Sequence, residues 1–405
     1  MATLSDPPQK SFHISQLIYD TRYRSTTIQV IAFILIMAGI WWLASNVVTN
    51  LATLGKDFDF SFLGNRAGYD INQMLIEYSN DSTHARAALV GILNTLLVAF
   101  LGCVTATIIG VTAGVLRLSK NWIVGRLMTV YVEGFRNIPL LLWIIVIFAV
   151  MTEATPQPRD FRGEDAEASM ILWDSVAITN RGIFMPSPEW GANSMLLVAI
   201  FLASIVGIFV YRSMARKKQE QTGVQSPVFL VGLALFFIPT LIAYFILGRP
   251  VTLNYPELGG FNFSGGLQLR NSLIALWIAL SLYTGAFIAE IVRAGILAVN
   301  KGQTEAASAL GLRPNRTMNL VVLPQALRVI IPPLISQYLN LTKNSSLAIA
   351  VGYMDVRATL GGITINQTGR ELEGMLLLGL FYLVTSLVIS GGMNLYNNSV
   401  KLQER

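Results

Sequence analysis

The chain has 405 residues, of which 53% are hydrophobic and only 13% are charged, whereas a soluble domain carries about 25% charged residues. Together with a mean hydropathy of +0.55, this composition favours an integral membrane protein over several soluble domains. Two histidines, His13 and His84, and the single Cys103 exclude a Cys/His zinc site and an internal disulfide, so we predict neither a metal site nor catalytic residues.

Stretches without charge predict eight membrane spans, because a helix needs about 20 mostly apolar residues to cross the hydrocarbon core. In chain order they are 25–55, 87–116, 137–152, 190–211, 221–248, 271–289, 329–354 and 374–400. The third is short, and the seventh contains Lys343. The first has an apolar run, 28–48, that is longer than a signal-peptide core and has no cleavage site after it, so we expect it to be retained. The expected fold class is all-α integral membrane.

The charges between these spans predict the orientation. With the N-terminus inside, the inner segments hold 18 of the 29 basic residues and 7 of the 23 acidic ones. The outer segments hold 10 basic and 16 acidic residues. This asymmetry predicts cytoplasmic N- and C-termini. It also explains the net charge of +6 without nucleic acid as a partner.

The longest outer segment, 153–189, contains four prolines and seven acidic residues. Because proline interrupts regular structure, we expect irregular backbone there, with a short helix near 165–173. Within the second span, Gly110 and Gly114 form a GxxxG pair. Such a pair allows close helix packing, either against a second chain or within this one.

The inner segment 290–328 has more pattern than a connecting loop needs. Thr304 is a candidate N-cap for a short helix over 305–310, which Gly311 ends and Pro314 prevents from continuing. A helix this short does not fold alone in water. We therefore expect its small apolar face to pack on its own membrane domain or on a partner; that face consists of Ala306, Ala307 and Leu310.

This segment resembles a known family. Glu305-Ala306-Ala307, then Gly311 and then Val321-Val322-Leu323-Pro324 are similar to the EAA–G–(I/V)xLP loop of binding-protein-dependent ABC importer permeases. The resemblance implies that the loop, here 301–325, docks into a cleft of a cytoplasmic ATPase dimer. The coupling residues it implies are Glu305, Ala306, Ala307, Gly311, Leu323 and Pro324.

Three further segments resemble the polar amino-acid permeases of that family: 131–141 (YxExFRGTPLL), 284–295 (AYxAEIxRGGI) and 341–347 (LxKDTSL). The chain departs from the family pattern at Asn137-Ile138 and at Asn344, and 151–269 interrupts the core. Long interrupted permeases of this kind are similar to the general L-amino-acid importers. The resemblance implies a type I (MetI-like) core.

The implied domains are an N-terminal segment with the first span and an outer loop (1–87), two core parts (88–150 and 270–405) and an insert with two extra spans (151–269). The implied partners are the ATPase dimer, a second permease, a periplasmic amino-acid-binding protein and the bilayer of a bacterial inner membrane. Because the only Gly-Lys pair, Gly55-Lys56, lacks a phosphate-binding context, we expect no cofactor on this chain and ATP on a partner subunit.

An ionisable group at the centre of a bilayer costs about 2.5–3.5 kcal/mol, so polar residues in the spans are candidates for the substrate path. These candidates are Glu290, Gln337, Asn340, Lys343 and Asn344. Each has a structural alternative. Glu290 and Arg293 share a helix face and favour an interfacial pair, Lys343 favours a structural ion pair or carbonyl contacts, and the amides are equally suited to joining helices.

Two other functions remain open. A self-sufficient secondary amino-acid transporter or channel would use the same spans and Lys343, but it has no need of the inner loop. An intramembrane enzyme would need a dyad of Lys343 with Ser345 or Ser346, whose neighbouring positions do not point at each other on a helix.

Overall fold

The computed structural model describes residues 16–53, 55, 58–163 and 166–400. The chain divides into two compact units, 1–63 and 64–405. Each unit is represented by those of its residues that the structure describes. The first unit contains the short α1 (Gln16–Tyr19) and the long α2 (Thr21–Thr53). The most apolar stretch of α2 is not buried at all, as suits a helix surrounded by lipid. Its place in the chain is that of the first predicted span.

Eight helical segments among the described residues are long and apolar enough to cross a membrane, which confirms the eight predicted spans. After α2, the second unit contributes α3 (His84–Leu116), α5 (Leu140–Glu153), α6 (Ser194–Thr222), α7 (Val228–Ile246), α8 (Asn271–Leu297), the segment 314–351 and α14 (Glu371–Val400). One further helix, α4 (Trp122–Asn137), leads into α5 through Pro139.

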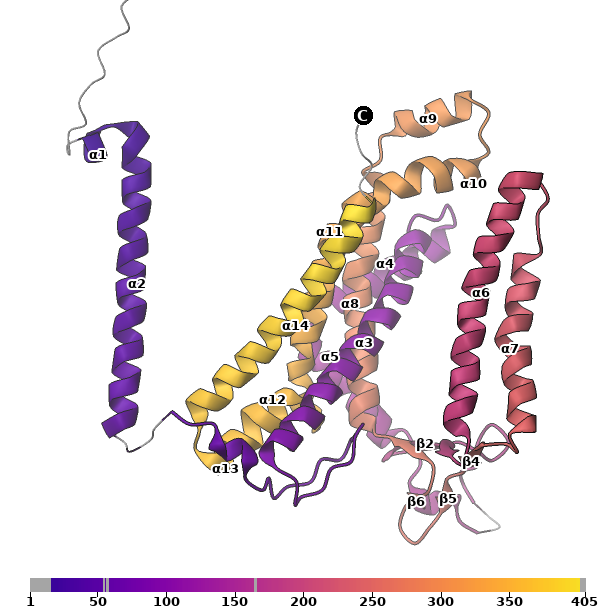
Figure 1. The fold of residues 1–405 in the computed structure, drawn as a ribbon, viewed down its shortest axis with the longest axis horizontal. Helices are drawn as coiled ribbons and strands as arrows, with labels where there is room; N and C mark the ends of the chain where they lie inside the picture. Colours follow the sequence, from indigo (N-terminus) through magenta and orange to yellow (C-terminus); the bar gives the residue numbers. More distant parts are fainter. Residues whose placement is uncertain (1–15, 54, 56–57, 164–165, 401–405) are drawn as a thin grey trace, which may run out of the picture. The chain divides into compact units, whose positions relative to one another are not determined.

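The core of this unit lies between α3 and α8, which run side by side (Figure 1). Gly110 and Gly114 of α3 allow the approach: a Cβ built on Gly114 would lie 2.6 Å from the carbonyl oxygen of Ala289, and one on Gly110 would lie 2.5 Å from the Cβ of Ile288. The GxxxG pair therefore packs within the chain. Of its two predicted alternatives, the structure has the intrachain one.

The segment 314–351 consists of α-, π- and 3-10-helical stretches that follow one another without a break. It begins with α10 (Pro314–Thr317), a π-helical turn (Met318–Val322) and α11 (Leu323–Asn344), and it ends in a 3-10 helix (Ser345–Val351). The π turn ends two residues before Pro324, which cannot donate a backbone hydrogen bond. Two short helices, α12 (Val356–Ala358) and α13 (Ile365–Thr368), and the π turn between them (Thr359–Thr364) then lead to α14.

The insert folds back on itself through small antiparallel sheets. Its strands are β1 (Ala177–Thr179), β2 (Gly182–Met185), β3 (Ser187–Trp190), β4 (Val251–Asn254), β5 (Glu257–Leu258), β6 (Phe263–Ser264) and β7 (Leu267–Leu269). They pair in the orders β1-β2-β7, β3-β4 and β5-β6. Strands that precede α6 thus pair with strands that follow α7, for example Ser187 with Asn254. We call residues 154–163, 166–193 and 247–270 the outer lobe.

The expectation of irregular backbone is correct for most of the described residues between 154 and 176, but the short helix over 165–173 is wrong. Residues 166–173 contain no helix, residues 164 and 165 lie outside the described part, and three strands follow from 177. Each of these strands is short, and β2 has the alternating burial of a two-sided sheet. Their partners lie more than 60 residues away along the chain in two of the three sheets, so no local pattern pointed to them.

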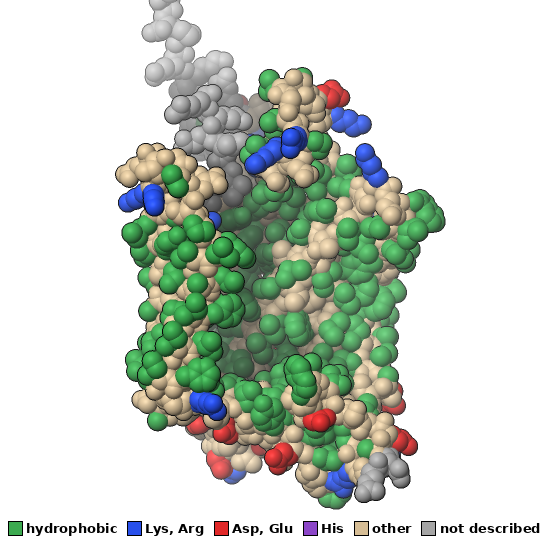
Figure 2. Space-filling model, turned by 90° about the vertical axis from the view of Figure 1, so that its right-hand side faces the viewer, with side chains coloured by type: hydrophobic (Ala, Val, Ile, Leu, Met, Phe, Trp, Pro, Cys, Tyr) green, Lys and Arg blue, Asp and Glu red, His purple; other side chains and the backbone are tan. Residues whose placement is uncertain are grey.

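Helices α6 and α7 pack chiefly against each other and not against the core. In Figure 2 the pair is the left-hand column, separated from the rest of this face by a recess lined with hydrophobic side chains. On the same face, most Lys and Arg side chains gather at one end and most Asp and Glu side chains at the other, where the outer lobe lies. The pair continues into the lobe at one end and does not complete the core.

Candidate coupling segment and polar path

The segment expected to couple to an ATPase is α9 (Lys301–Ala309), which lies at the end of the bundle opposite the outer lobe (Figure 1). It begins after Asn300, whose side chain accepts a hydrogen bond from the backbone N–H of Gly302 at 2.8 Å. The predicted start at Thr304 is therefore wrong, because Asn is also a strong N-cap and lies further upstream. Thr304 lies inside the helix and donates its hydroxyl hydrogen to the carbonyl of Lys301.

The end of α9 is as predicted. Gly311 follows it in the left-handed region with a φ of 76°, which is the usual role of glycine after a helix. Nothing lies within 4 Å of a Cβ built there. The backbone conformation, not crowding, is what requires glycine at this position.

Five of the six candidate coupling residues lie on two neighbouring helices, α9 and α11, and Gly311 lies between them in the chain. Glu305 and Ala306 of α9 are exposed, and Ala307 packs inward with 4% of its surface exposed. Leu323 and Pro324 open α11. The Gln325 side chain donates a hydrogen bond to that of Gln303 at 3.4 Å and so joins α11 to α9. The predicted apolar face is divided: Ala307 holds α9 to its own chain, while Ala306 and Leu310 face outward.

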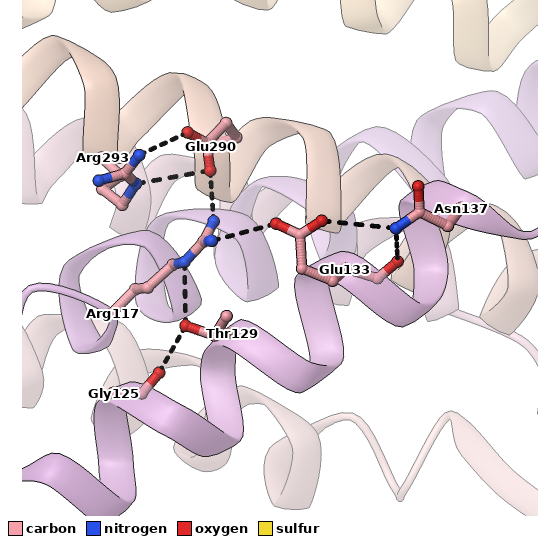
Figure 3. Close-up of polar contacts among 7 residues, drawn as sticks. All are labelled: Arg117, Gly125, Thr129, Glu133, Asn137, Glu290 and Arg293. Atoms are coloured by element: carbon pink, nitrogen blue, oxygen red, sulfur yellow. Dashed lines mark hydrogen bonds and ion pairs between the residues drawn. The ribbon is translucent and has the colours of Figure 1, made fainter.

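A network of charged side chains ties three helices together at the same end of the bundle (Figure 3). Arg117, directly after α3, contacts Glu290 of α8 and pairs with Glu133 of α4 at 3.2 Å. It also donates a hydrogen bond to Thr129 at 3.2 Å. Glu290 in turn pairs with Arg293 at 2.9 Å.

Glu290 is therefore held in ion pairs, as its structural alternative predicted. Arg117 was not a candidate from the sequence, although it is the first charge after an uncharged run of about a membrane thickness. That position places it at the same boundary as Glu133 and Glu290. Because its guanidinium bridges carboxylates on two helices, it is the centre of the network.

The remaining path candidates lie on α11. Asn340 and Lys343 are exposed and Gln337 and Asn344 are half-buried. Ser336, which we did not predict, is also exposed, and its spacing to the two exposed candidates places all three on one helix face. We call Ser336, Asn340 and Lys343 the polar face of α11. Lys343 makes no ion pair with any residue that the structure describes.

The serine–lysine dyad does not form. Ser345 is fully buried, and its hydroxyl donates to the carbonyl of Thr342 at 2.7 Å. Lys343, near the end of the preceding α11, is exposed. Among the described residues, no group of three or more His, Cys, Asp or Glu side chains is arranged to hold a metal ion.

Two arginines, one on α4 and one on α11, have buried nitrogens without hydrogen-bond partners among the described residues. Nε and Nη2 of Arg328 on α11, and Nε of Arg136 on α4, find no hydrogen-bond acceptor in the described part of the chain. The Arg136 guanidinium also lies over the Phe287 ring, 5.3 Å from its centre. Arg136 lies close enough to Glu290 to interact with its charge, whereas Arg328 forms no ion pair with a described residue. A buried donor without an acceptor is costly, so Arg328 favours an acceptor outside this chain.

At the opposite end of the bundle, Asp355 is completely buried. Its Oδ1 accepts a hydrogen bond from the backbone N–H of Ala358 at 2.9 Å and caps α12, while Oδ2 has no partner among the described residues. Burial raises the pKa of this carboxyl to about 6. Tyr353 and Tyr382 lie close enough to interact with its charge.

Comparison with known proteins gives consistent matches. Residues 221–402 match the family described as binding-protein-dependent transport system inner membrane component. The chain is 56% identical over 428 residues to the glutamate/glutamine/aspartate/asparagine transport system permease protein BztB of Rhodobacter capsulatus, covering 100% of both chains. It is 45% identical to the general L-amino acid transport system permease protein AapQ of Rhizobium johnstonii, covering 96% of this chain and 95% of that one. Among solved structures, an amino acid ABC transporter crystallised with histidines has a TM-score of 0.45 and 18% identity, covering 78% of this chain and 95% of that chain.

Proposed function

This chain belongs to the amino-acid permeases of the binding-protein-dependent transport system inner membrane component family, and we propose that it imports L-amino acids as one half of a pair of different permeases. As a member of that family it is a multi-pass inner-membrane subunit of an ABC transporter, not an enzyme, and it works with ATPase and permease partners. The observation that carries the proposal is the polar face of α11, which is uncovered within a membrane-crossing segment.

The polar face of α11 requires an aqueous or protein neighbour. Lipid would leave Lys343 unsolvated at a cost of about 2.5–3.5 kcal/mol. A water-filled path between two permeases would hydrate it and expose it to the carboxylates of an amino acid. A permease named for glutamate, glutamine, aspartate and asparagine aligns with this chain along its whole length, which supports small amino acids with acidic or amide side chains as substrates.

A second permease would also account for the buried nitrogens of Arg328 that have no hydrogen-bond acceptor among the described residues. An acidic or carbonyl group on the partner would satisfy the buried nitrogens of Arg328, which find no acceptor on the described residues of this chain. A partner of different sequence is favoured because two copies would bring two Lys343 side chains and two Arg328 side chains into one path, where like charges repel.

Coupling runs through α9. In the proposed assembly ATP binds between the ATPase subunits, and this chain carries no cofactor. Glu305, Ala306 and the exposed Leu310 face the ATPase, while Ala307 and the Gln303–Gln325 contact pass its movement to α11. The N- and C-termini lie in the cytoplasm with α9, and a periplasmic binding protein delivers the amino acid at the end that carries the outer lobe. Lipid surrounds the assembly, and nucleic acid is not a partner.

Purification of this chain from its native membrane tests the proposal. We expect an ATPase and a second permease to be recovered with it, as measured by mass spectrometry. Gly311→Asp strains the backbone at the end of α9 and should weaken ATPase recovery. Gly248→Asp is the matched control, because Gly248 has a φ of 74° and equally open surroundings at the outer end of α7. Recovery of the chain alone, in all three forms, would support a secondary transporter instead.

A further inference from the structure

The outer lobe exposes two aromatic side chains to an unusual degree. Trp173 is 97% exposed and Phe261 is 92% exposed, the two highest values among the large hydrophobic side chains described. Neither lies on a membrane-crossing helix. Single exposed hydrophobic residues are common and need no explanation, so what distinguishes these two is how the backbone holds them.

Trp173 lies at the centre of a strained turn. Leu172, Trp173 and Asp174 have φ values of 53°, 57° and 56°, so three successive residues with side chains are left-handed. Each such residue is disfavoured by its Cβ, and a strained segment persists only where its surroundings hold it. Here an antiparallel bridge between Ile171 and Val176 closes the turn, and the Ser175 hydroxyl donates to the carbonyl of Leu172.

Phe261 lies in the loop between β5 and β6, which two arginines hold. Arg162 donates hydrogen bonds to the carbonyls of Gly259, at 2.6 Å, and of Gly260. Arg181 donates to the carbonyl of Phe261 itself at 3.0 Å. The guanidinium groups thus fix the loop backbone from positions far away in the sequence, and the ring remains outside.

The residues that flank both loops belong to the same small hydrophobic cluster. Met170 and Ala177 flank the Trp173 turn, Leu258 and Phe263 flank the Phe261 loop, and all four belong to the cluster around Phe184. The two aromatic side chains are therefore held on one rigid scaffold. Exposed aromatic residues that are fixed before binding lose little entropy when a partner covers them, and such residues dominate many protein interfaces.

The position of the lobe favours a soluble partner over the membrane surface. In Figure 1, β5 and β6 lie further from the ends of the helices than β4, which directly follows α7. Trp190, at the end of β3 just before α6, is 62% exposed and suits the aromatic belt at a membrane interface. Glu167, Asp174 and Glu257 on the lobe are exposed and form no ion pair with another described residue. The described part of the lobe carries as many arginines as acidic residues, so these carboxylates favour single basic residues placed opposite them on a partner and not a basic partner as a whole.

We propose that the outer lobe docks the soluble amino-acid-binding protein of the importer, with Trp173 and Phe261 in apolar depressions of that protein and its Lys and Arg residues facing the lobe carboxylates. This inference rests on the proposed function. It assigns to the insert the role of holding the binding protein beside the core while the amino acid is released.

The test uses the complete importer in lipid nanodiscs and measures ATP hydrolysis while its binding protein, loaded with glutamate, is titrated. In Trp173→Ala/Phe261→Ala we expect the concentration for half-maximal stimulation to rise at least tenfold, with basal and saturated rates unchanged. Trp190→Ala is the matched control and should leave all three values unchanged. In the triple variant Glu167→Gln/Asp174→Asn/Glu257→Gln, the association of the binding protein with the importer should become slower and less dependent on salt concentration.

An unchanged half-maximal concentration in the double aromatic variant would overturn the inference. Quenching of Trp173 fluorescence by brominated lipid, in a variant that lacks the other tryptophans, would also overturn it and would assign the turn to the membrane surface. Failure of the proposed function is distinguishable, because the wild-type importer would then show no stimulation by the loaded binding protein at all.

Discussion

The α3–α8 pair and the α6–α7 pair are both formed by strongly apolar membrane helices, yet they pack very differently. In its most apolar stretch, 72% of α8 is buried, against 6% of α7. The α3–α8 interface contains glycines whose missing side chains let the backbones touch. The α6–α7 pair exposes large side chains such as Phe229 and Phe245 to its surroundings.

The difference shows that hydropathy identifies a membrane helix but does not say what it packs against. Lipid tails are as apolar as leucine, so apolar side chains gain little by leaving lipid for another helix. Close backbone approach and polar contacts decide the partners instead. The core has both, whereas the α6–α7 pair packs chiefly on itself.

The largest expected effect concerns the polar face of α11. Lys343→Met should reduce amino-acid uptake in proteoliposomes more than tenfold, because it removes the one charge on that face. Lys343→Arg keeps the charge and should retain more uptake. Assembly with the ATPase should be the same in both variants. Normal uptake by Lys343→Met would show that the face is neither a substrate path nor a structural contact.

The glycine packing is the next test. Gly114→Ala places a Cβ 2.6 Å from the carbonyl oxygen of Ala289. Because a backbone atom cannot move aside as a flexible side chain can, this overpacking should lower the free energy of unfolding by about 3 kcal/mol. Gly207→Ala in α6 meets nothing within 4 Å and should be neutral or slightly stabilising. Thermal unfolding in detergent measures both. Equal melting temperatures would remove the contrast between the two helix pairs.

Asp355 predicts a pH dependence of stability. Its pKa is raised in the folded chain, from 3.8 to about 6, so its contribution is fully present below about pH 4 and is lost as the pH rises through 6. At 1.36 kcal/mol per pKa unit this amounts to roughly 2–3 kcal/mol.

Asp355→Asn keeps the capping oxygen and cannot ionise. Compared with the wild type, it should therefore be similar at pH 4 and more stable at pH 7. Melting temperatures across that range measure the difference. A difference that does not vary with pH would contradict this account of the buried carboxyl.

The smallest effect concerns ion pairs. Arg117→Met removes the centre of a partly buried network, in which 13% of the Arg117 side chain is exposed, and should cost roughly 1–2 kcal/mol, between the values for surface and buried pairs. Arg216→Met in α6 breaks an exposed pair with Glu220 and should cost less than about 0.5 kcal/mol. Chemical unfolding of both variants gives the comparison, and equal losses would mean that the network adds nothing beyond a surface pair.

Sequence patterns predicted the spans, the end of α9 at Gly311 and the Glu290–Arg293 pair, because each of these features depends on residues that are close together in the chain. They did not predict the outer lobe, whose strands pair across the whole α6–α7 pair, nor Arg117, whose partners lie on two other helices. The start of α9 was missed for a local reason: two good capping residues, Asn300 and Thr304, compete within one turn.

The most direct test of the account is uptake by proteoliposomes that contain this chain with its co-purified partners and the loaded binding protein. We predict uptake of glutamate or glutamine that requires ATP on the ATPase side and does not respond to a proton or sodium gradient. Uptake driven by an ion gradient without ATP would contradict coupling through α9 and would assign the chain to self-sufficient transport.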